Sequence, residues 1–200
     1  MPDTSAELVY LVGFVIGSGV RMAYARRRGG GGVALRRGTV LDSVLVLLAG
    51  LGSLMPVVQL FSGWLGFADY AGPGWSVPVG AVVFAGALVL LWRSHANLGG
   101  QWSPRLEVQE GHVLVTGGVY GRVRHPMYAA HWLWGVAQVL LIHNWLAGPA
   151  LLVTFLPLYL VRVPLEERML AERFGAAYGS YAARTGRLIP RRRPGGRPRR

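Results

Sequence analysis

The stretch GVYGRVRHPMYAAHWLWGVAQVLL, residues 118–141, joins a polar segment to an apolar one. Its first half contains two arginines and a histidine, and its second half is almost wholly apolar. Polar and ionisable groups are costly in hydrocarbon, so a cluster of them directly before an apolar segment indicates a site at the membrane surface. The stretch therefore predicts a membrane helix with a functional site at its water-facing end.

The composition also indicates a membrane protein. Of the 200 residues, 52% are apolar and only 15% are charged, which is unusual for a water-soluble fold. The chain has no cysteine, so disulfides, thiolate nucleophiles and cysteine metal sites are excluded. All 21 basic residues are arginine and the net charge is +12. The lack of lysine suggests a prokaryotic source with a GC-rich genome.

Five apolar runs predict the fold class. They cover residues 8–24, 40–61, 75–92, 127–146 and 147–161. We expect an all-α integral membrane protein with about five transmembrane helices. The last two runs meet at a turn of about four residues around Asn144 to Gly148, which predicts a tight antiparallel helical hairpin.

The arginines predict the orientation in the membrane. The segments after the first, third and fifth runs are rich in arginine, whereas those after the second and fourth contain none. Under the positive-inside rule, the N-terminus lies outside and the C-terminus is cytoplasmic. We expect the protein in a prokaryotic cytoplasmic membrane.

The His125–Pro126 pair predicts a helix start. The residue before a proline is disfavoured in a helix, and proline suits the first helical turn. Arg124 and His125 should therefore flank a helix N-terminus, whose free N–H groups and dipole favour an anion. An anionic ligand group is expected there.

A second polar segment, residues 162–190, follows the fifth run. Pro164 is expected to begin a C-terminal interfacial helix. One face of that helix would carry Glu167, Ala171, Phe174, Tyr178 and Tyr181. Glu166 and Glu167 follow Arg162 at the membrane edge, where ionisable groups are usually paired or functional. Interfacial ion pairs and a functional site are both open at this point.

Three motifs in a fixed order carry a family resemblance. They are R-H-P-x-Y at 124–128, E-E-x-x-L at 166–170 and F-G-x-x-Y-x-x-Y at 174–181. In this order they resemble the isoprenylcysteine carboxyl methyltransferase (ICMT) family and, more loosely, the membrane phospholipid N-methyltransferases. The resemblance covers residues 98–190.

The resemblance implies an enzyme that uses S-adenosyl-L-methionine in a cytoplasm-facing pocket, with a lipophilic acceptor entering sideways from the bilayer. Carried over position by position, the cofactor-binding residues are Gln101, Tyr120, Arg124, His125, Pro126, Tyr128, Glu166 and Glu167. Arg162 and Glu167 match the arginine and glutamate that the family needs for catalysis. No metal site is expected, because the histidines lack paired ligand spacing.

The chain is accordingly expected to have three parts. Residues 1–97 would form transmembrane helices 1–3, and residues 98–190 the cofactor-binding catalytic region with helices 4 and 5 and the interfacial helix. Residues 191–200 would form a basic disordered tail. Proline and glycine exclude a folded recognition helix in this tail, so anionic lipid headgroups rather than nucleic acid are its expected partner.

The acceptor type decides the catalytic chemistry. A carboxylate acceptor needs no base, and Arg162 would hold it by a bidentate contact. An amine or thiol would need proton removal by His125, Glu167 or a tyrosine. Lipid-like carboxyl, amine and thiol acceptors all stay open. His131 is expected to be an interhelical hydrogen-bonding group rather than a substrate contact.

Two other functions compete with methyl transfer. A sterol- or steroid-type membrane reductase has distantly similar last helices and uses NADPH. A non-catalytic membrane protein would keep the scaffold and bind anionic lipids through its arginines. Cofactor identity separates these hypotheses.

Overall fold

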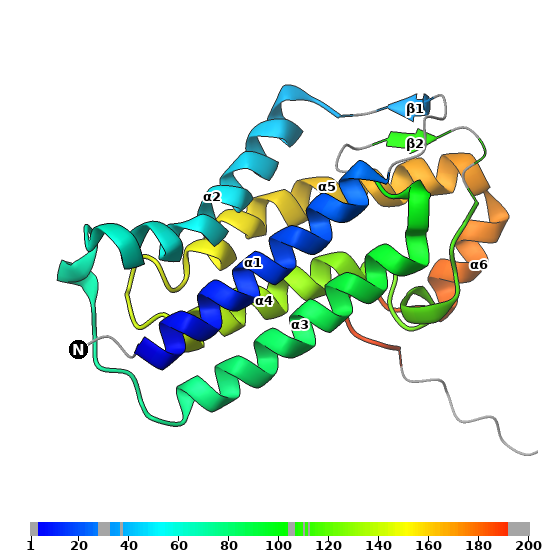
Figure 1. Cartoon of the computed structure of the whole chain (residues 1–200). Coiled ribbons are helices and arrows are strands. Elements are labelled where there is room, and N and C mark those ends of the chain that lie inside the picture. Colours follow the sequence, from blue (N-terminus) through cyan, green and yellow to red (C-terminus); the bar gives the residue numbers. More distant parts are fainter. Residues whose placement is uncertain are drawn as a thin grey trace, which may run out of the picture.

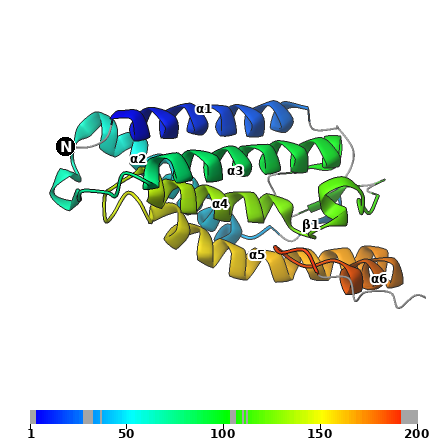
Figure 2. The same ribbon diagram turned by 90° about the horizontal axis from the view of Figure 1, so that it is seen from below.

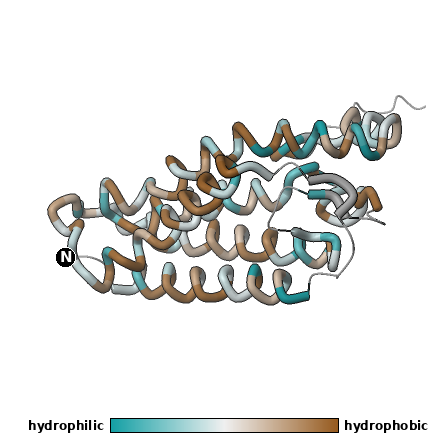
Figure 3. Tube along the Cα trace, turned by 90° about the horizontal axis from the view of Figure 1, so that it is seen from above, coloured by the Kyte–Doolittle hydropathy of each residue, from teal (hydrophilic) through white to brown (hydrophobic). Residues whose placement is uncertain are grey.

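Three long helices begin the chain. The computed structural model describes residues 4–27, 33–36, 38–103, 107–109, 111 and 113–191. Helices α1 (Thr4–Arg26), α2 (Val40–Ser62) and α3 (Ser76–Leu98) are each long and apolar enough, by length and composition, to cross a membrane (Figure 1). Figure 3 shows apolar residues along the helices and hydrophilic ones gathered toward one end.

The second half of the chain completes the bundle. It contains α4 (Pro126–Leu141), α5 (Ala150–Phe174) and α6 (Ala176–Arg184). Helix α3 packs on α1 and α4, and α2 packs on α5 (Figure 2). Short 3₁₀ turns are η1 (Gly66–Ala68), η2 (Gly99–Gln101) and η3 (Gly118–Gly121). The predicted helical membrane fold is confirmed, with three of the five expected spans meeting the criteria of length and composition.

Small residues let the helices approach closely. A Cβ at Gly13 of α1 would lie within 3 Å of the Phe84 ring, and one at Gly80 of α3 within 3 Å of Leu141. Tyr10 stacks on Phe84 with ring centroids 5.7 Å apart. Close packing of this kind holds helices together in lipid, where water does not drive their association.

Helix α5 extends further than predicted. It continues through Pro157 and Pro164 to Phe174, so the expected separate helix beginning at Pro164 is wrong. An internal proline removes one backbone hydrogen bond, but α5 packs along α2 and neighbouring groups can satisfy the freed carbonyls. Helix α5 ends before Gly175, which has a φ of 50°, a backbone conformation that favours glycine over other residues. The predicted stripe is therefore divided between α5 and α6.

The turn between α4 and α5 is longer than predicted. Helix α4 ends at Leu141 and α5 begins at Ala150, so residues 142–149 connect them. The side-chain oxygen of Asn144 accepts hydrogen bonds from the backbone N–H groups of Leu146, at 3.0 Å, and Ala147, at 2.8 Å. An asparagine that caps the backbone in this way favours a turn even within an apolar sequence.

One pair of strands departs from the all-α prediction. β1 (Val33–Arg36) and β2 (Glu107–Gln109) are antiparallel and lie at the same end of the bundle as α6 (Figure 1). Two loops that meet at one end can satisfy their backbone groups by pairing, which local sequence patterns do not reveal. Of the predicted basic tail, residues 192–200 lie outside the described residues.

Candidate functional site

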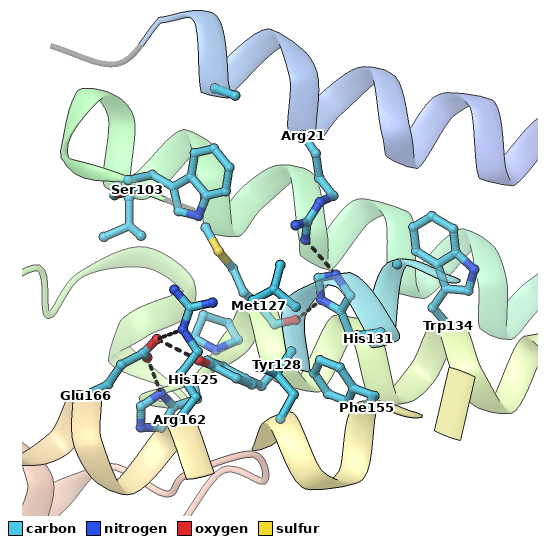
Figure 4. Close-up of a pocket in the computed structure, with 18 of the residues that line it drawn as sticks. Arg21, Ser103, His125, Met127, Tyr128, His131, Trp134, Phe155, Arg162 and Glu166 are labelled. Atoms are coloured by element: carbon cyan, nitrogen blue, oxygen red, sulfur yellow. Dashed lines mark hydrogen bonds and ion pairs between the residues drawn. The ribbon is translucent and has the colours of Figure 1, made fainter. Parts of the chain in front are cut away.

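A cavity of about 680 Å³ lies among α1, α2, α4 and α5. Its volume is within the range of roughly 300–1,000 Å³ that small-molecule sites occupy. Charged side chains cluster at one end of the cavity (Figure 4). Its apolar lining includes Phe14, Leu54, Trp134, Leu151 and Phe155. The cavity can therefore accept a molecule with a polar end and an apolar end.

The structure brings almost all the predicted site residues to this cavity. Its lining includes Gln101, Tyr120, Arg124, His125, Pro126, Tyr128, Arg162 and Glu166. They come from η2, η3 with its following turn, the start of α4, and α5. Glu167 is not among the lining residues, but it contacts Arg124 and His125, which are.

The start of α4 agrees with the sequence prediction. Pro126 is the first helical residue and His125 is the N-cap, with a φ of −124°. The backbone N–H groups of Arg124 and His125 donate to the carbonyls of Gly186, at 2.8 Å, and Arg187, at 3.0 Å. The segment after α6 thus runs beside residues 123–125 and occupies the backbone N–H groups of Arg124 and His125. The anion expected at the first turn of α4 stays a prediction.

Glu166 is the centre of the polar cluster in the cavity. The Tyr128 hydroxyl donates to Glu166 Oε1 at 2.6 Å, and Arg162 Nε lies 3.3 Å from the same oxygen. His125 Nδ1 lies 3.7 Å from Glu166 Oε2. The Glu166 side chain is still 28% exposed. A carboxylate held in this way can accept hydrogen bonds from a ligand.

Glu167 forms a second ionic cluster, which shares His125 with the cluster around Glu166. It accepts from Arg124 Nη2 at 3.0 Å, His125 Nε2 at 3.2 Å and Arg187 Nη2 at 2.6 Å. Burial acts to raise the pKa of Glu167, but hydrogen bonds from His125, Arg187 and Arg124 outweigh it and hold this pKa well below its usual range. Glu167 is therefore ionised and joins α5 to the start of α4 and the segment after α6.

Helix α6 and the segment after it contribute contacts that local sequence reasoning did not predict. The Arg124 guanidinium donates to the carbonyls of Ala182 and Thr185, and the Tyr181 hydroxyl donates to the Tyr120 carbonyl at 2.8 Å. A Cβ at Gly186 would lie under 3 Å from a backbone oxygen. Only glycine fits there. The glycine of the T-G-R run at 185–187 was therefore the one local sign that this segment packs closely against another part of the backbone.

Two further interactions in the cavity join helices that are distant in sequence. Arg162 Nε of α5 lies 3.5 Å from Asp42 Oδ1 of α2. Arg21 Nη1 of α1 lies 2.8 Å from His131 Nε2 of α4 (Figure 4). The prediction that His131 makes an interhelical hydrogen bond is confirmed. Its position in the cavity lining and its partner, Arg21, were not predicted.

The fold and the cavity define a class of protein: a helical membrane protein that encloses a polar site beside apolar side chains. Residues 79–172 match the model of the isoprenylcysteine carboxyl methyltransferase (ICMT) family. Protein-S-isoprenylcysteine O-methyltransferase A of Arabidopsis thaliana is 30% identical over 112 residues, which are 56% of this chain and 54% of the relative. A probable protein-S-isoprenylcysteine O-methyltransferase of Oryza sativa subsp. indica is 28% identical over 151 residues, 76% of this chain and 75% of that relative.

A solved structure supports the same fold. The eukaryotic intramembrane Ras methyltransferase ICMT matches with a TM-score of 0.52 and 24% identity, over 78% of this chain and 54% of that chain. The resemblance to the ICMT family is therefore confirmed, and the relatives are methyltransferases by name. The chain spans about half the length of the Arabidopsis relative and of the solved structure.

Proposed function

We propose that this chain is an integral-membrane methyltransferase that uses S-adenosyl-L-methionine to methylate a lipophilic acceptor. The acceptor class that we favour is an isoprenylcysteine-type carboxylate, as in the names of the relatives. The observation that carries the proposal is one cavity lined both by the ionic cluster around Glu166 and by apolar side chains. A charged donor and a lipid-like acceptor can meet there.

The residues of the cavity fit the proposed cofactor. Glu166 offers a partly exposed carboxylate for an ammonium group or ribose hydroxyls. Tyr120 and Tyr128 supply aromatic rings, which suit an adenine face or a sulfonium cation. When bound, S-adenosyl-L-methionine supplies a methyl group that its sulfonium charge has already activated.

The chain's own residues would act mainly by positioning and by excluding water. A carboxylate acceptor loses no proton, so no general base is required. Arg162 is fixed between Asp42 and Glu166 and holds the Glu166 carboxylate in place. Glu167 fixes Arg124 and His125 from behind. In this proposal Glu166 contacts the cofactor, whereas Arg162 and Glu167, predicted as catalytic, position the groups around it.

The topology forms part of the proposal. The 16 residues of α4 rise about 24 Å at about 1.5 Å each, somewhat less than the hydrocarbon core. Together with the apolar part of α5 it would complete five spans, with an outside N-terminus and a cytoplasmic site. Residues 1–97 would then form the membrane scaffold, and 98–190 the catalytic region of a prokaryotic cytoplasmic-membrane enzyme. The arginines of the tail, residues 191–200, would bind anionic headgroups.

Ligand-induced stabilisation tests this function. The purified protein in detergent should gain thermal stability from S-adenosylhomocysteine, because a ligand that binds only the folded state stabilises it. NADPH should have no effect. Radioactive methyl donor added to membranes should then label an extractable lipophilic product. Stabilisation by NADPH alone would reject the proposal and favour the reductase.

A further inference from the structure

Arg21 is a charge in an unusual position. It lies inside α1, where the nearest charged residues in the sequence are Glu7 and Arg26. Its guanidinium points into the cavity toward His131 (Figure 4). An arginine within a membrane segment is costly and usually faces a polar partner or a functional cavity.

The partner of Arg21 orients it without neutralising its charge. His131 Nδ1 lies 2.7 Å from the Met127 carbonyl oxygen, which can only accept a hydrogen bond. Nδ1 therefore carries the ring proton, and the bare Nε2 accepts from Arg21. His131 is thus a neutral imidazole in this arrangement, and the guanidinium keeps its full positive charge.

The other two arginines in the cavity lining are each paired with carboxylates. Arg124 pairs with Glu167, and Arg162 lies near both Asp42 and Glu166. Within the part of the chain that the structure describes, no carboxylate forms an ion pair with Arg21. Arg21 is therefore the arginine of the lining best suited to bind an anion from outside the chain.

The surroundings of Arg21 indicate what kind of anion it would bind. The His131 ring stacks on Phe155, with centroids 5.2 Å apart, and lies 6.3 Å from the Trp134 ring. Apolar side chains thus begin directly beside the guanidinium, on the side away from Glu166 (Figure 4). A single uncompensated charge matches a carboxylate better than a phosphate monoester, which carries about two charges. These features suit an amphiphile with one carboxylate.

We propose that Arg21, held by His131, binds the carboxylate of the lipophilic acceptor. This inference rests on the proposed methyl transfer. In that reaction a carboxylate oxygen forms the new bond to the methyl carbon as the carbon–sulfur bond breaks. The electron pair of the carbon–sulfur bond stays on sulfur. The products are a neutral ester and a neutral thioether, and no proton moves. Arg21 attracts the acceptor but not the ester, so the same contact favours product release.

A matched pair of probes tests this contact. N-acetyl-S-farnesylcysteine and its carboxamide share the same tail and differ in the charge of the head. We expect the wild-type protein to bind the carboxylate about tenfold more tightly, because hydrogen bonds to charged groups are the strong ones. Arg21→Gln should abolish this preference, and Arg93→Gln, an exposed arginine stacked on Trp92 of α3, should retain it. Dissociation constants measured in detergent report the result.

A second variant and a second ligand make the outcome decisive. His131→Phe keeps a ring against Phe155 but cannot hold Arg21, so it should also reduce the preference. The affinity for S-adenosylhomocysteine should stay unchanged in both variants. A preference that survives both variants, no preference in the wild type, or a parallel loss of S-adenosylhomocysteine affinity overturns the proposal. Binding of S-adenosylhomocysteine by the wild type tests the methyltransferase function separately.

Discussion

The two ends of the helical bundle bury polar groups in different ways. At the end that holds the α4–α5 turn, the Asn144 amide donates to the Leu65 carbonyl at 2.7 Å and to Asp69 Oδ1 at 2.6 Å. Its oxygen accepts two backbone N–H groups. At the other end, Glu166 and Arg162 face a cavity of about 680 Å³.

The difference separates a structural polar cluster from a candidate site. A cavity of about 410 Å³ also lies beside Asn144, but among the described residues that line it there is no arginine. The side chain of Asn144 makes its hydrogen bonds to two loops and so holds these loops together. The site end places charges of both signs beside apolar side chains, so it can take up a charged ligand and an apolar one.

Asn144→Ala should be the most destabilising change and should leave the site intact. The substitution leaves the N–H groups of Leu146 and Ala147 without their acceptor, and it removes one of the two donors to the Leu65 carbonyl. Because each buried unsatisfied group costs about 1–3 kcal/mol, we expect a loss of about 3 kcal/mol in the free energy of unfolding. A lower thermal midpoint with unchanged affinity for S-adenosylhomocysteine checks this.

Ser62→Ala is the matched control at that end. It removes one exposed hydrogen bond, from the Trp64 N–H at 3.2 Å, and should change the midpoint little. A fall in cofactor affinity in Asn144→Ala would show that the two ends are coupled and would contradict the comparison.

Glu166→Gln should have the opposite profile. Glutamine keeps the shape of the side chain and can still accept from the Tyr128 hydroxyl, and Arg162 keeps Asp42 as its ion-pair partner, so the thermal midpoint should change little. The loss of charge should weaken S-adenosylhomocysteine binding by about 2 kcal/mol, or roughly thirtyfold, since a hydrogen bond to a charged group contributes about that much. Titration calorimetry in detergent measures it.

Glu172→Gln, at an exposed position on the same helix, provides the control for Glu166→Gln. Its affinity should match the wild type. If Glu166→Gln lowered the midpoint but kept full affinity, Glu166 would be a structural group like Asn144, and the site would have to lie elsewhere in the cavity.

Local rules predicted the start of the site well. The His125–Pro126 pair alone defined the first residue of α4, because proline restricts both itself and the residue before it. The family motifs then identified Arg124, Tyr128 and Glu166 as neighbours, and the structure brings all three to one cavity. Such predictions depend on residues close in sequence or on a known pattern.

Pairs between distant helices could not be predicted in the same way. Arg21 and His131 are separated by 110 positions, and their meeting depends on how α1 and α4 sit around α3. A hydropathy pattern gives the face of a helix but not its neighbour. The error at Pro164 has a related cause, since packing along α2 overrode a local rule that usually begins a helix.

The Glu167 cluster, which fixes the site from behind, should make stability depend on pH. Hydrogen bonds from His125, Arg187 and Arg124 outweigh burial and hold the folded pKa of Glu167 below its ordinary value of 4.5. A carboxyl with a lowered folded pKa contributes stability that is fully present well above pH 4.5. That contribution is lost as the pH falls toward the folded pKa.

We therefore expect the Glu167 contribution to fall by about 1.4 kcal/mol at pH 3.5, one pH unit below its unfolded pKa. Between pH 6.5 and pH 3.5 the thermal midpoint should fall further in the wild type than in Glu167→Gln, because glutamine has no carboxyl group to protonate. The thermal midpoint of Glu172→Gln should fall as much as that of the wild type, because this substitution leaves the Glu167 cluster intact. Equal drops in the wild type and Glu167→Gln would mean that the ionisation of Glu167 contributes nothing to stability.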